Sequence, residues 1–313
     1  MGFLNDNFIA DFFLLAVQWL YRFLQEYSLT IIIVALFVRL LTLPMDIKQR
    51  ANSKKMVKIA PEVESLKKRY ANNPDQINIR VNKLYKERGI NPMAGCLPMI
   101  LQMVFLFAFY GALQKIATKE TMSIVLRAAE DGAANVQLTK WLWVNNLWQP
   151  DSGMAGVMPS AAEFLTFLQS NTNTITPQTM GILQSKGLVL FSEGIMSVNE
   201  ASYNALTAGI ISENGLTGLN NGWFILPVLS GGSMFLQQMI STKLNPNPSM
   251  DQQMGMMKII YPIISFVICL SSNTMFAIYW TFTSLYSILV DVIFNMIYRA
   301  KEKKQKAAVQ TAQ

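Results

Sequence analysis

The chain has 313 residues, of which 51% are hydrophobic and only 14% charged, so it favours a membrane protein over a soluble domain, where about 25% of residues are charged. It contains no histidine, which excludes a histidine general base, a Ser-His pair and a histidine metal ligand. The two cysteines, Cys96 and Cys269, are too few for a disulfide scaffold or a thiolate zinc site.

The first apolar segment covers residues 8–24, and one acid, one amide and one arginine interrupt it. It lacks the basic leader and the small-residue cleavage site of a signal peptide. We therefore predict that residues 1–26 hold an amphipathic helix in the outer membrane interface, with Trp19 and Tyr21 at headgroup depth. The pattern leaves open whether a signal or a further span precedes this segment.

Five later segments have the length and apolar character of membrane spans. A bilayer core about 30 Å thick needs roughly 20 apolar helical residues. The predicted spans are residues 27–45, 93–116, 223–242, 254–272 and 273–298. The fourth is marginal, because Lys258 has to reach toward the headgroups. The predicted fold class is an all-α polytopic membrane protein with five transmembrane helices.

Charge predicts how these spans are oriented. The connection 46–92 carries 12 basic residues against five acids, and the tail 299–313 carries five against one. The connection 117–222 carries four basic residues against eight acids. By the positive-inside rule the first two are cytoplasmic, as is the loop 243–253, and the third lies outside. The amino terminus is then outside and the carboxyl terminus inside.

The cytoplasmic connection has helical periodicity on both sides of a breaker at Asn72–Asp75. Apolar residues recur at spacings of three and four from Met56 to Tyr70 and again from Ile77 to Leu84, which predicts an antiparallel helical hairpin. Its basic outer faces suit anionic lipid, ribosomal RNA or an acidic partner, and the alternative is a solvated loop that only fixes topology. The candidate ribosome or lipid contacts are Lys54, Lys55, Lys58, Lys67, Lys68, Arg69, Arg299, Lys301, Lys303 and Lys304.

The outer connection 117–222 is too long for a simple loop. Its apolar stretches indicate a small ordered cap or interfacial helices. Trp141, Trp143 and Trp148 are interpreted as interface anchors. Nothing in this segment identifies a ligand, and its fold and role stay open.

Arg39 is the informative polar residue of the first span. A guanidinium near the middle of a span costs roughly 2.5–3.5 kcal/mol on insertion scales, so it needs water or partners. The alternative is that Arg39, about 7 Å along the helix axis from Pro44, reaches the cytoplasmic headgroups. Further polar residues in the spans are Gln102, Gln237, Gln238, Thr281, Thr283, Ser284, Ser287 and Asp291. Polar faces from several helices predict a wet cavity, although some of these groups can form ordinary interhelical hydrogen bonds.

Several runs in fixed order resemble landmarks of the YidC/Oxa/Alb membrane protein insertase family. They are IIVALFVRLLTLPMDIKQ from Ile32, KMVKIAPEVESLKKRY from Lys55, NPMAGCLPMILQMVFLFAFYGAL from Asn91, LPVLSGGSMFLQQM from Leu226 and AIYWTFTSLYSIL from Ala277. The resemblance covers residues 8–116 and 222–306. Bacterial relatives with a large outer domain usually carry it before the first core span, so the insertion 117–222 departs from the family pattern.

The resemblance implies five helices around a hydrophilic groove that is open to the cytoplasm and to lipid and closed outside. It places the groove arginine at Arg39 and implies that Gln102, Gln237, Tyr279, Trp280 and Ser284 line or flank the groove. At helical spacing, Tyr279 or Trp280, Thr283 or Ser284, and Ser287 mark one face of the fifth span.

The predicted function is a membrane protein insertase or chaperone of the bacterial plasma membrane that uses no covalent catalysis, metal or cofactor. The chain has no GxxxxGK[ST] nucleotide motif. Nascent membrane proteins and anionic lipids are the expected partners, with the ribosome and the Sec translocon as further candidates, and a monomer should suffice. The alternatives are a small-solute transporter or channel that uses the same polar groups, and a lipid-binding scaffold.

Overall fold

The computed structural model describes residues 8–91, 97–170, 175–244 and 257–311. Its chain divides into two compact units. Unit 1 comprises Met1–Ile31, Phe107–Leu229 and Phe266–Trp280, and unit 2 comprises Ile32–Leu106, Ser230–Ser265 and Thr281–Gln313. Each unit is described by itself below.

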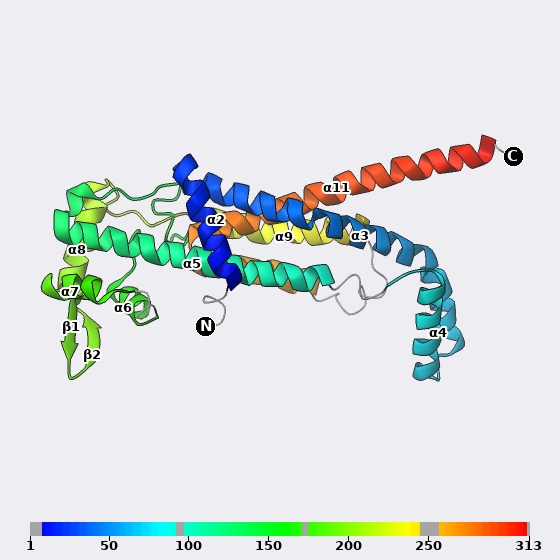
Figure 1. The fold of residues 1–313 in the computed structure, drawn as a ribbon, viewed down its shortest axis with the longest axis horizontal. Helices are drawn as coiled ribbons and strands as arrows, with labels where there is room; N and C mark the ends of the chain where they lie inside the picture. The colour runs from blue at the N-terminus through cyan, green and yellow to red at the C-terminus, as the bar shows by residue number, and fades with distance from the viewer. Residues whose placement is uncertain (1–7, 92–96, 171–174, 245–256, 312–313) are drawn as a thin grey trace. The chain divides into compact units, whose positions relative to one another are not determined.

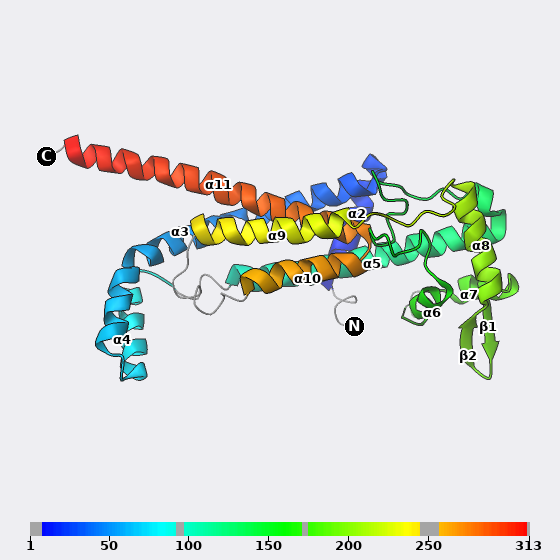
Figure 2. The same cartoon turned by 180° about the vertical axis from the view of Figure 1, so that it is seen from behind.

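Each predicted span contains a long helix, although Trp223, Phe224, Ser272 and Asn273 at span ends are not helical (Figures 1 and 2). The helices are α3 (Tyr27–Arg69), α5 (Leu97–Asp131), α9 (Ile225–Leu244), α10 (Met257–Ser271) and α11 (Thr274–Thr311). Within the described residues, α3, α5 and α11 are long and apolar enough to cross a membrane, whereas α10 is a shorter apolar helix. The all-α polytopic class is thereby confirmed. The number of five spans stays a prediction, and residues 93–96 and 254–256 of two predicted spans lie outside the described residues.

The helix α3 is much longer than a membrane span. Its 43 residues extend about 65 Å, and Pro44 and Pro61 lie inside it. Each proline removes one backbone hydrogen bond, and Figure 1 shows that α3 is bent along its length. The predicted first span and the first arm of the predicted hairpin are therefore one helix.

The second arm of the hairpin is α4 (Pro74–Glu87). Its start is capped by Asn73, whose side-chain oxygen accepts a hydrogen bond from the backbone nitrogen of Gln76 at 3.1 Å. A small core between the arms holds Met56, Ile59, Tyr85 and Ile90, with Val63, Val81 and Leu84 packed against it. Both Nη2 contacts of Arg88 with the carboxylate of Glu62, at 3.0 and 2.9 Å, join the arms at the surface.

Unit 1 contains the amino-terminal helix α2 (Phe8–Leu24), which crosses α5 steeply (Figure 1). Its buried side packs on α5 through Phe13 and Phe109, whose ring centroids are 5.4 Å apart. An ion pair of 2.8 Å between Lys115 and Asp11 ties the two helices together. The opposite side presents an exposed stripe at helical spacing, made of Phe8, Phe12, Leu15, Trp19 and Phe23.

The outer insertion begins inside a helix, because α5 continues to Asp131. After the short 3-10 helix η2 (Ala133–Asn135) come α6 (Ala161–Ser170), α7 (Pro177–Ser185), the strands β1 (Val189–Ser192) and β2 (Ile195–Val198), and α8 (Glu200–Glu213). The strands form an antiparallel hairpin in which Val189 pairs with Val198. The intervening Glu193 and Gly194 both have positive φ, as a two-residue hairpin turn requires.

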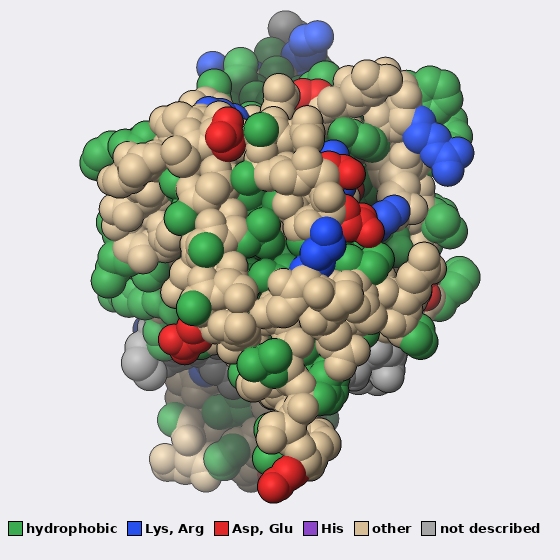
Figure 3. Space-filling view, turned by 90° about the vertical axis from the view of Figure 1, so that its left-hand side faces the viewer, with side chains coloured by type: hydrophobic (Ala, Val, Ile, Leu, Met, Phe, Trp, Pro, Cys, Tyr) green, Lys and Arg blue, Asp and Glu red, His purple; other side chains and the backbone are tan. Residues whose placement is uncertain are grey.

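The insertion has its own core, which includes Phe164, Leu168, Leu183, Tyr203 and Ile210. The rings of Phe164 and Tyr203 stack with centroids 4.6 Å apart. Figure 3, which looks onto this end, shows mostly uncharged side chains with small groups of acidic and basic ones. The described part of the insertion thus has helices, a strand pair that the sequence did not specify, and a core of its own, while its role as a cap stays a prediction.

Candidate functional site

Arg39 lies on the apolar part of α3 and is half-buried in unit 2. Its guanidinium forms no hydrogen bond or ion pair with another described residue. Its backbone carbonyl accepts a hydrogen bond from Thr42 Oγ1 at 3.2 Å. The site therefore contains a partly buried cation whose N–H groups make no ion pair with a described acidic residue.

From residue 281 to residue 295, one side of α11 in unit 2 is polar and buried. At spacings of one to four residues it carries Thr281, Thr283, Ser284, Ser287, Asp291 and Asn295. Ser287 donates a hydrogen bond to the backbone carbonyl of Thr283 at 2.9 Å, and Ser284 Oγ lies 3.9 Å from Met234 Sδ on α9. Among the described residues, Thr281 Oγ1 is buried without a hydrogen-bond partner. This face, called here the α11 polar face, has hydrogen-bonding capacity beyond what its own helix needs.

The other predicted groove residues fall into two groups. Gln102 on α5 is exposed and Gln237 on α9 is half-buried, and both belong to unit 2 with Arg39. Tyr279 and Trp280 belong to unit 1, where they form an aromatic cluster with ring-centroid distances of 4.3 Å from Tyr279 to Phe109 and 5.4 Å from Trp280 to Phe276. The structure thus places these two residues among aromatic rings of unit 1.

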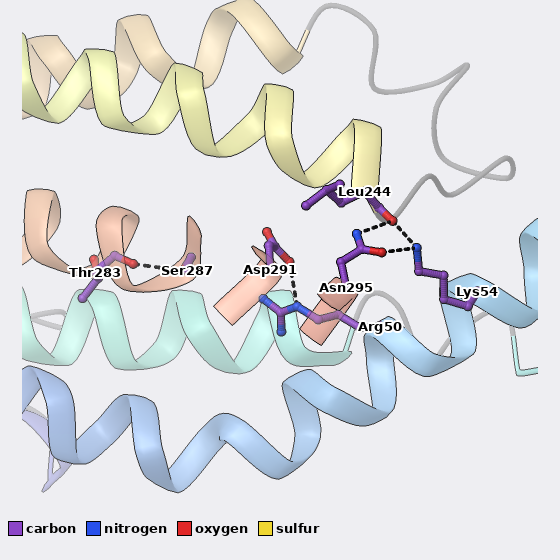
Figure 4. Close-up of polar contacts among 7 residues, drawn as sticks. All are labelled: Arg50, Lys54, Leu244, Thr283, Ser287, Asp291 and Asn295. Atoms are coloured by element: carbon purple, nitrogen blue, oxygen red, sulfur yellow. Dashed lines mark hydrogen bonds and ion pairs between the residues drawn. The ribbon is translucent and has the colours of Figure 1, made fainter. Parts of the chain in front are cut away.

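A group of polar contacts at the carboxyl end of α9 was not predicted (Figure 4). Arg50 Nε on α3 lies 2.7 Å from Asp291 Oδ1 on α11, and their side chains are only 13% and 4% exposed. Lys54 Nζ donates to the carbonyl oxygen of Leu244, the last residue of α9, and to Asn295 Oδ1 at 3.1 Å. Asn295 Nδ2 also donates to the Leu244 carbonyl at 3.2 Å. These contacts, called here the polar clamp, join α3, α9 and α11.

The polar clamp changes the interpretation of Lys54. We expected Lys54 to be an outward contact for ribosome or lipid, but it is half-buried and neutralises the negative end of α9. The sequence did indicate that Asp291 has a partner, because an aspartate within an apolar segment needs a cation or water. Spacing alone did not identify which of the many nearby basic residues would serve.

The remaining basic residues are on the surface. Lys55, Lys58, Lys67, Lys68 and Arg69 are exposed on the hairpin arm of α3, and Arg299, Lys301, Lys303 and Lys304 are exposed on α11. The tail is not a separate extended segment, because α11 continues as a helix to Thr311. An open pocket of about 590 Å³ lies between the hairpin arms, and its lining includes the charged residues Glu62, Arg69, Arg80, Lys83 and Glu87.

Two buried serines link the neighbouring helices α9 and α10. Ser230 Oγ and Ser265 Oγ are 2.7 Å apart, and both residues are fully buried. This is the ordinary interhelical hydrogen bond that sequence reasoning offered as the alternative to a wet cavity. No group of three acidic or cysteine residues in the described part of the chain could hold a metal ion.

Long apolar helices with buried polar faces define the chain as a multi-pass membrane protein of the all-α class. The family described as "60Kd inner membrane protein" matches residues 19–205, well over half of the chain. The chain therefore belongs to this family, which is the YidC/Oxa family that its motifs resemble. The match runs through most of the outer insertion.

Curated relatives carry the name "Membrane protein insertase YidC". One from Clostridium perfringens is 37% identical over 144 residues, which are 46% of this chain and 52% of the relative. One from Pelodictyon phaeoclathratiforme is 30% identical over 214 residues, 64% of this chain and 33% of the relative. One from Wolinella succinogenes is 24% identical over 307 residues, 98% of this chain and 40% of the relative. The chain thus spans between a third and about half of the length of these relatives.

Proposed function

We propose that the chain is a membrane protein insertase that moves nascent membrane proteins from the cytoplasm into the bilayer through a polar intramembrane groove. The observation that carries the proposal is Arg39, a half-buried cation that forms no ion pair with another described residue. Such a residue in an apolar helix costs free energy and is retained where function needs it. Its family membership and the names of its relatives support this assignment.

The work of the groove is to reduce a transfer cost. A client's hydrophilic tail loses its hydration on entering lipid, and each unsatisfied polar group there costs several kcal/mol. The α11 polar face and Gln237 replace part of that hydration with hydrogen bonds, while Arg39 attracts acidic residues of the tail. No covalent step is involved, and partition of the client's apolar helix together with the membrane potential supplies the driving force.

The client's apolar helix leaves sideways into lipid along α9 and α11. Both helices expose large apolar side chains in unit 2 that suit a hydrocarbon environment. On α9 and α11 these include Phe235, Leu236, Met239, Leu285 and Leu289. Contact with such side chains stabilises an apolar client segment before it is surrounded by lipid.

Charge supports the orientation with the amino terminus outside and the carboxyl terminus in the cytoplasm. The exposed stripe of α2 then lies in the outer interface. The basic hairpin and tail face anionic lipid headgroups, and the ribosome is a second partner that the same charges fit. The Sec translocon is a further partner, and one copy of the chain is sufficient for the groove.

Substitution of Arg39 tests the proposal. Arg39→Lys should keep most insertion of a single-span client with an acidic tail, whereas Arg39→Ala and Arg39→Glu should lose it. The measurement is protease protection of the client tail in vesicles that contain each variant at equal level. A client with a neutral tail is the internal control and should be less affected. Equal insertion by all three variants would restore the alternative in which Arg39 only reaches the headgroups.

The competing function, a small-solute transporter or channel, uses the same polar residues as a permeation path. It predicts solute flux through vesicles in the absence of a client, and it predicts no dependence on the charge of a client tail. Flux that Arg39→Ala abolishes, with client insertion unchanged, would favour the transporter over the insertase.

A further inference from the structure

The outer insertion contains one segment, residues 145–151, that packs against helix ends instead of joining the insertion core. Leu147 and Trp148 in this segment are buried, at 0% and 3% exposure. The indole ring of Trp148 packs edge-on against Tyr27, the first residue of α3, with centroids 4.8 Å apart. Its Nε1 is buried and has no hydrogen-bond partner among the described residues, so shape and not polarity holds this side chain.

The same segment caps the start of α11. The carbonyl oxygen of Gln149 accepts two hydrogen bonds from Thr274, one from the backbone nitrogen at 3.0 Å and one from Oγ1 at 2.7 Å. Thr274 is completely buried, and its backbone nitrogen is one of the first donors of the helix, which have no partner within it. A residue of the insertion thus satisfies a helix end of the predicted fifth span.

The last residue of the segment, Asp151, holds the start of α9. Its buried carboxylate accepts hydrogen bonds from the backbone nitrogens of Trp223 and Leu226, at 2.8 and 2.7 Å, and from Trp143 Nε1 at 3.0 Å. An acidic group at this position also complements the positive end of the helix. A Cβ added at Gly222 would lie 1.9 Å from Asp151 Oδ1, so only glycine permits this approach.

Two buried asparagines fix the segment itself. Asn146 donates from its backbone nitrogen to Asn221 Oδ1 at 2.7 Å and from Nδ2 to the Val157 carbonyl at 2.8 Å. Asn221 Nδ2 donates to the carbonyls of Asn146 and Pro150, both at 2.9 Å. Because both asparagines are at most 1% exposed, these hydrogen bonds form a water-excluded frame that defines the path of residues 145–151.

We propose that residues 145–151 form a positioning segment that holds the outer ends of α3, α9 and α11 in place and keeps this end of the helices closed to ions. All contacts that carry this inference lie within unit 1. The statements that these are the outer ends and that the helices serve client insertion rest on the proposed function.

The test is ion leak through the reconstituted full chain. Vesicles of phosphatidylethanolamine and phosphatidylglycerol with a trapped pH-sensitive dye report proton entry when a potassium diffusion potential is applied, and no client is added. Trp148→Ala, Asp151→Ala and Thr274→Val should each raise the leak several-fold over the unsubstituted protein. The double variant Asp151→Ala/Thr274→Val should leak less than the two single effects combined, because both act through one segment.

Matched controls keep the test specific. Trp148→Phe keeps an aromatic ring against Tyr27 but fills less of the buried space, so it should leak less than Trp148→Ala. Ser271→Ala and Thr166→Val remove hydroxyls that donate to carbonyls of their own helices, at 3.1 and 3.0 Å, and should not leak either. If Asp151→Ala does not fold, Thr274→Val decides, since it replaces one hydroxyl by a methyl group of similar size. A leak at the unsubstituted level in helical, monodisperse Thr274→Val and Trp148→Ala overturns the proposal, as does an equal leak in the controls.

The two proposals fail separately. Loss of client insertion in Arg39→Ala with an intact ion barrier concerns the insertase proposal alone. Leak in Thr274→Val concerns the positioning segment even if the unsubstituted chain inserts no client.

Discussion

At the scale of single residues, the ion pair between Arg50 and Asp291 is the strongest local constraint on the helices of unit 2. Its distance of 2.7 Å and low exposure place two opposite charges where water screens them little. Burying such a pair is costly, so its net stabilisation is small, but removing one partner leaves an uncompensated buried charge. The pair therefore contributes more to the relative position of α3 and α11 than to the net free energy of unfolding.

We expect Arg50→Ala and Asp291→Ala each to destabilise the detergent-solubilised chain by about 3 kcal/mol, because each leaves one buried charge unpaired. The double variant Arg50→Leu/Asp291→Leu should recover much of that loss. Denaturant unfolding followed by circular dichroism measures these differences. Lys83→Ala, at an exposed pair with a 3.9 Å separation from Glu87, is the control and should change stability by less than about 0.5 kcal/mol. Equal effects at both sites would contradict this account.

We expect the stability of the insertion to depend on pH through Tyr203. Burial, reinforced by Glu163, raises the pKa of Tyr203 well above its ordinary value of 10.0, and its hydroxyl donates to the Pro159 carbonyl at 3.0 Å. Below pH 10 the Tyr203 hydroxyl is protonated in both the folded and the unfolded state, so its full contribution to the free energy of unfolding is present. Above the ordinary pKa the unfolded state loses this proton first, so the free energy of unfolding falls as pH rises.

Limited proteolysis of the insertion should therefore accelerate between about pH 9 and pH 11. Tyr203→Phe should flatten this pH profile. The same variant should lower stability at neutral pH by about 1 kcal/mol, because the Pro159 carbonyl loses its donor. A steep profile that persists in Tyr203→Phe would assign the pH dependence to another group.

At the scale of elements, the sequence predicted where helices are and missed where they end. The first span is predicted to end at residue 45, directly after Pro44, but α3 continues through this proline to Arg69 at the loss of one backbone hydrogen bond. In the same way α5 continues past residue 117 to Asp131. Bilayer thickness sets how much of a helix is apolar, and it does not set where the backbone stops being helical.

The strand pair in the insertion shows a different limit. The apolar run at residues 188–191 is too short to separate a strand from a helical turn by periodicity. The turn at Glu193 and Gly194 is the signal that identifies a hairpin there. The strands then pack against the core that α6 and α8 form around Phe164 and Tyr203.

We expect hydrogen exchange to divide the hairpin into two parts. The arm of α3 around Arg50 and Lys54 should exchange slowly, because the polar clamp ties it to α9 and α11. The helix α4 should exchange faster, because a small core around Tyr85 is its main support. Tyr85→Ala should accelerate exchange in α4 and leave α11 unchanged. Uniform exchange along both arms would show that the polar clamp does not stiffen α3.

At the scale of the whole molecule, the polar residues of the spans were predictable as a set, since each breaks an apolar run. Thr283, Ser284 and Ser287 do share the buried α11 polar face. Their partners were not predictable, because a sequence with 26 basic residues offers too many candidates for one buried aspartate. The role of Arg39 and the other groove residues stays a prediction.

The basic tail allows one test on the intact protein. Deleting residues 301–313 removes four lysines, of which Lys301, Lys303 and Lys304 are exposed, and keeps Arg299. We expect weaker association with ribosomes at low salt and unchanged topology, since each basic residue near an anionic surface contributes about 1 kcal/mol. Cosedimentation measures the first and protease accessibility the second. Ribosome association that is unchanged by the deletion would reduce the tail to a topological anchor.

The continuity of α3 also has a mechanical consequence. Arg39 and the hairpin residue Met56 lie on the same helix, α3, about 25 Å apart along its axis. A rotation of the hairpin arm is therefore transmitted to Arg39 through the helix backbone. Pro44, which lacks a backbone hydrogen bond, lies between the two residues, and the polar clamp holds α3 against α9 and α11. A movement that turns the hairpin arm of α3 should therefore also turn Arg39.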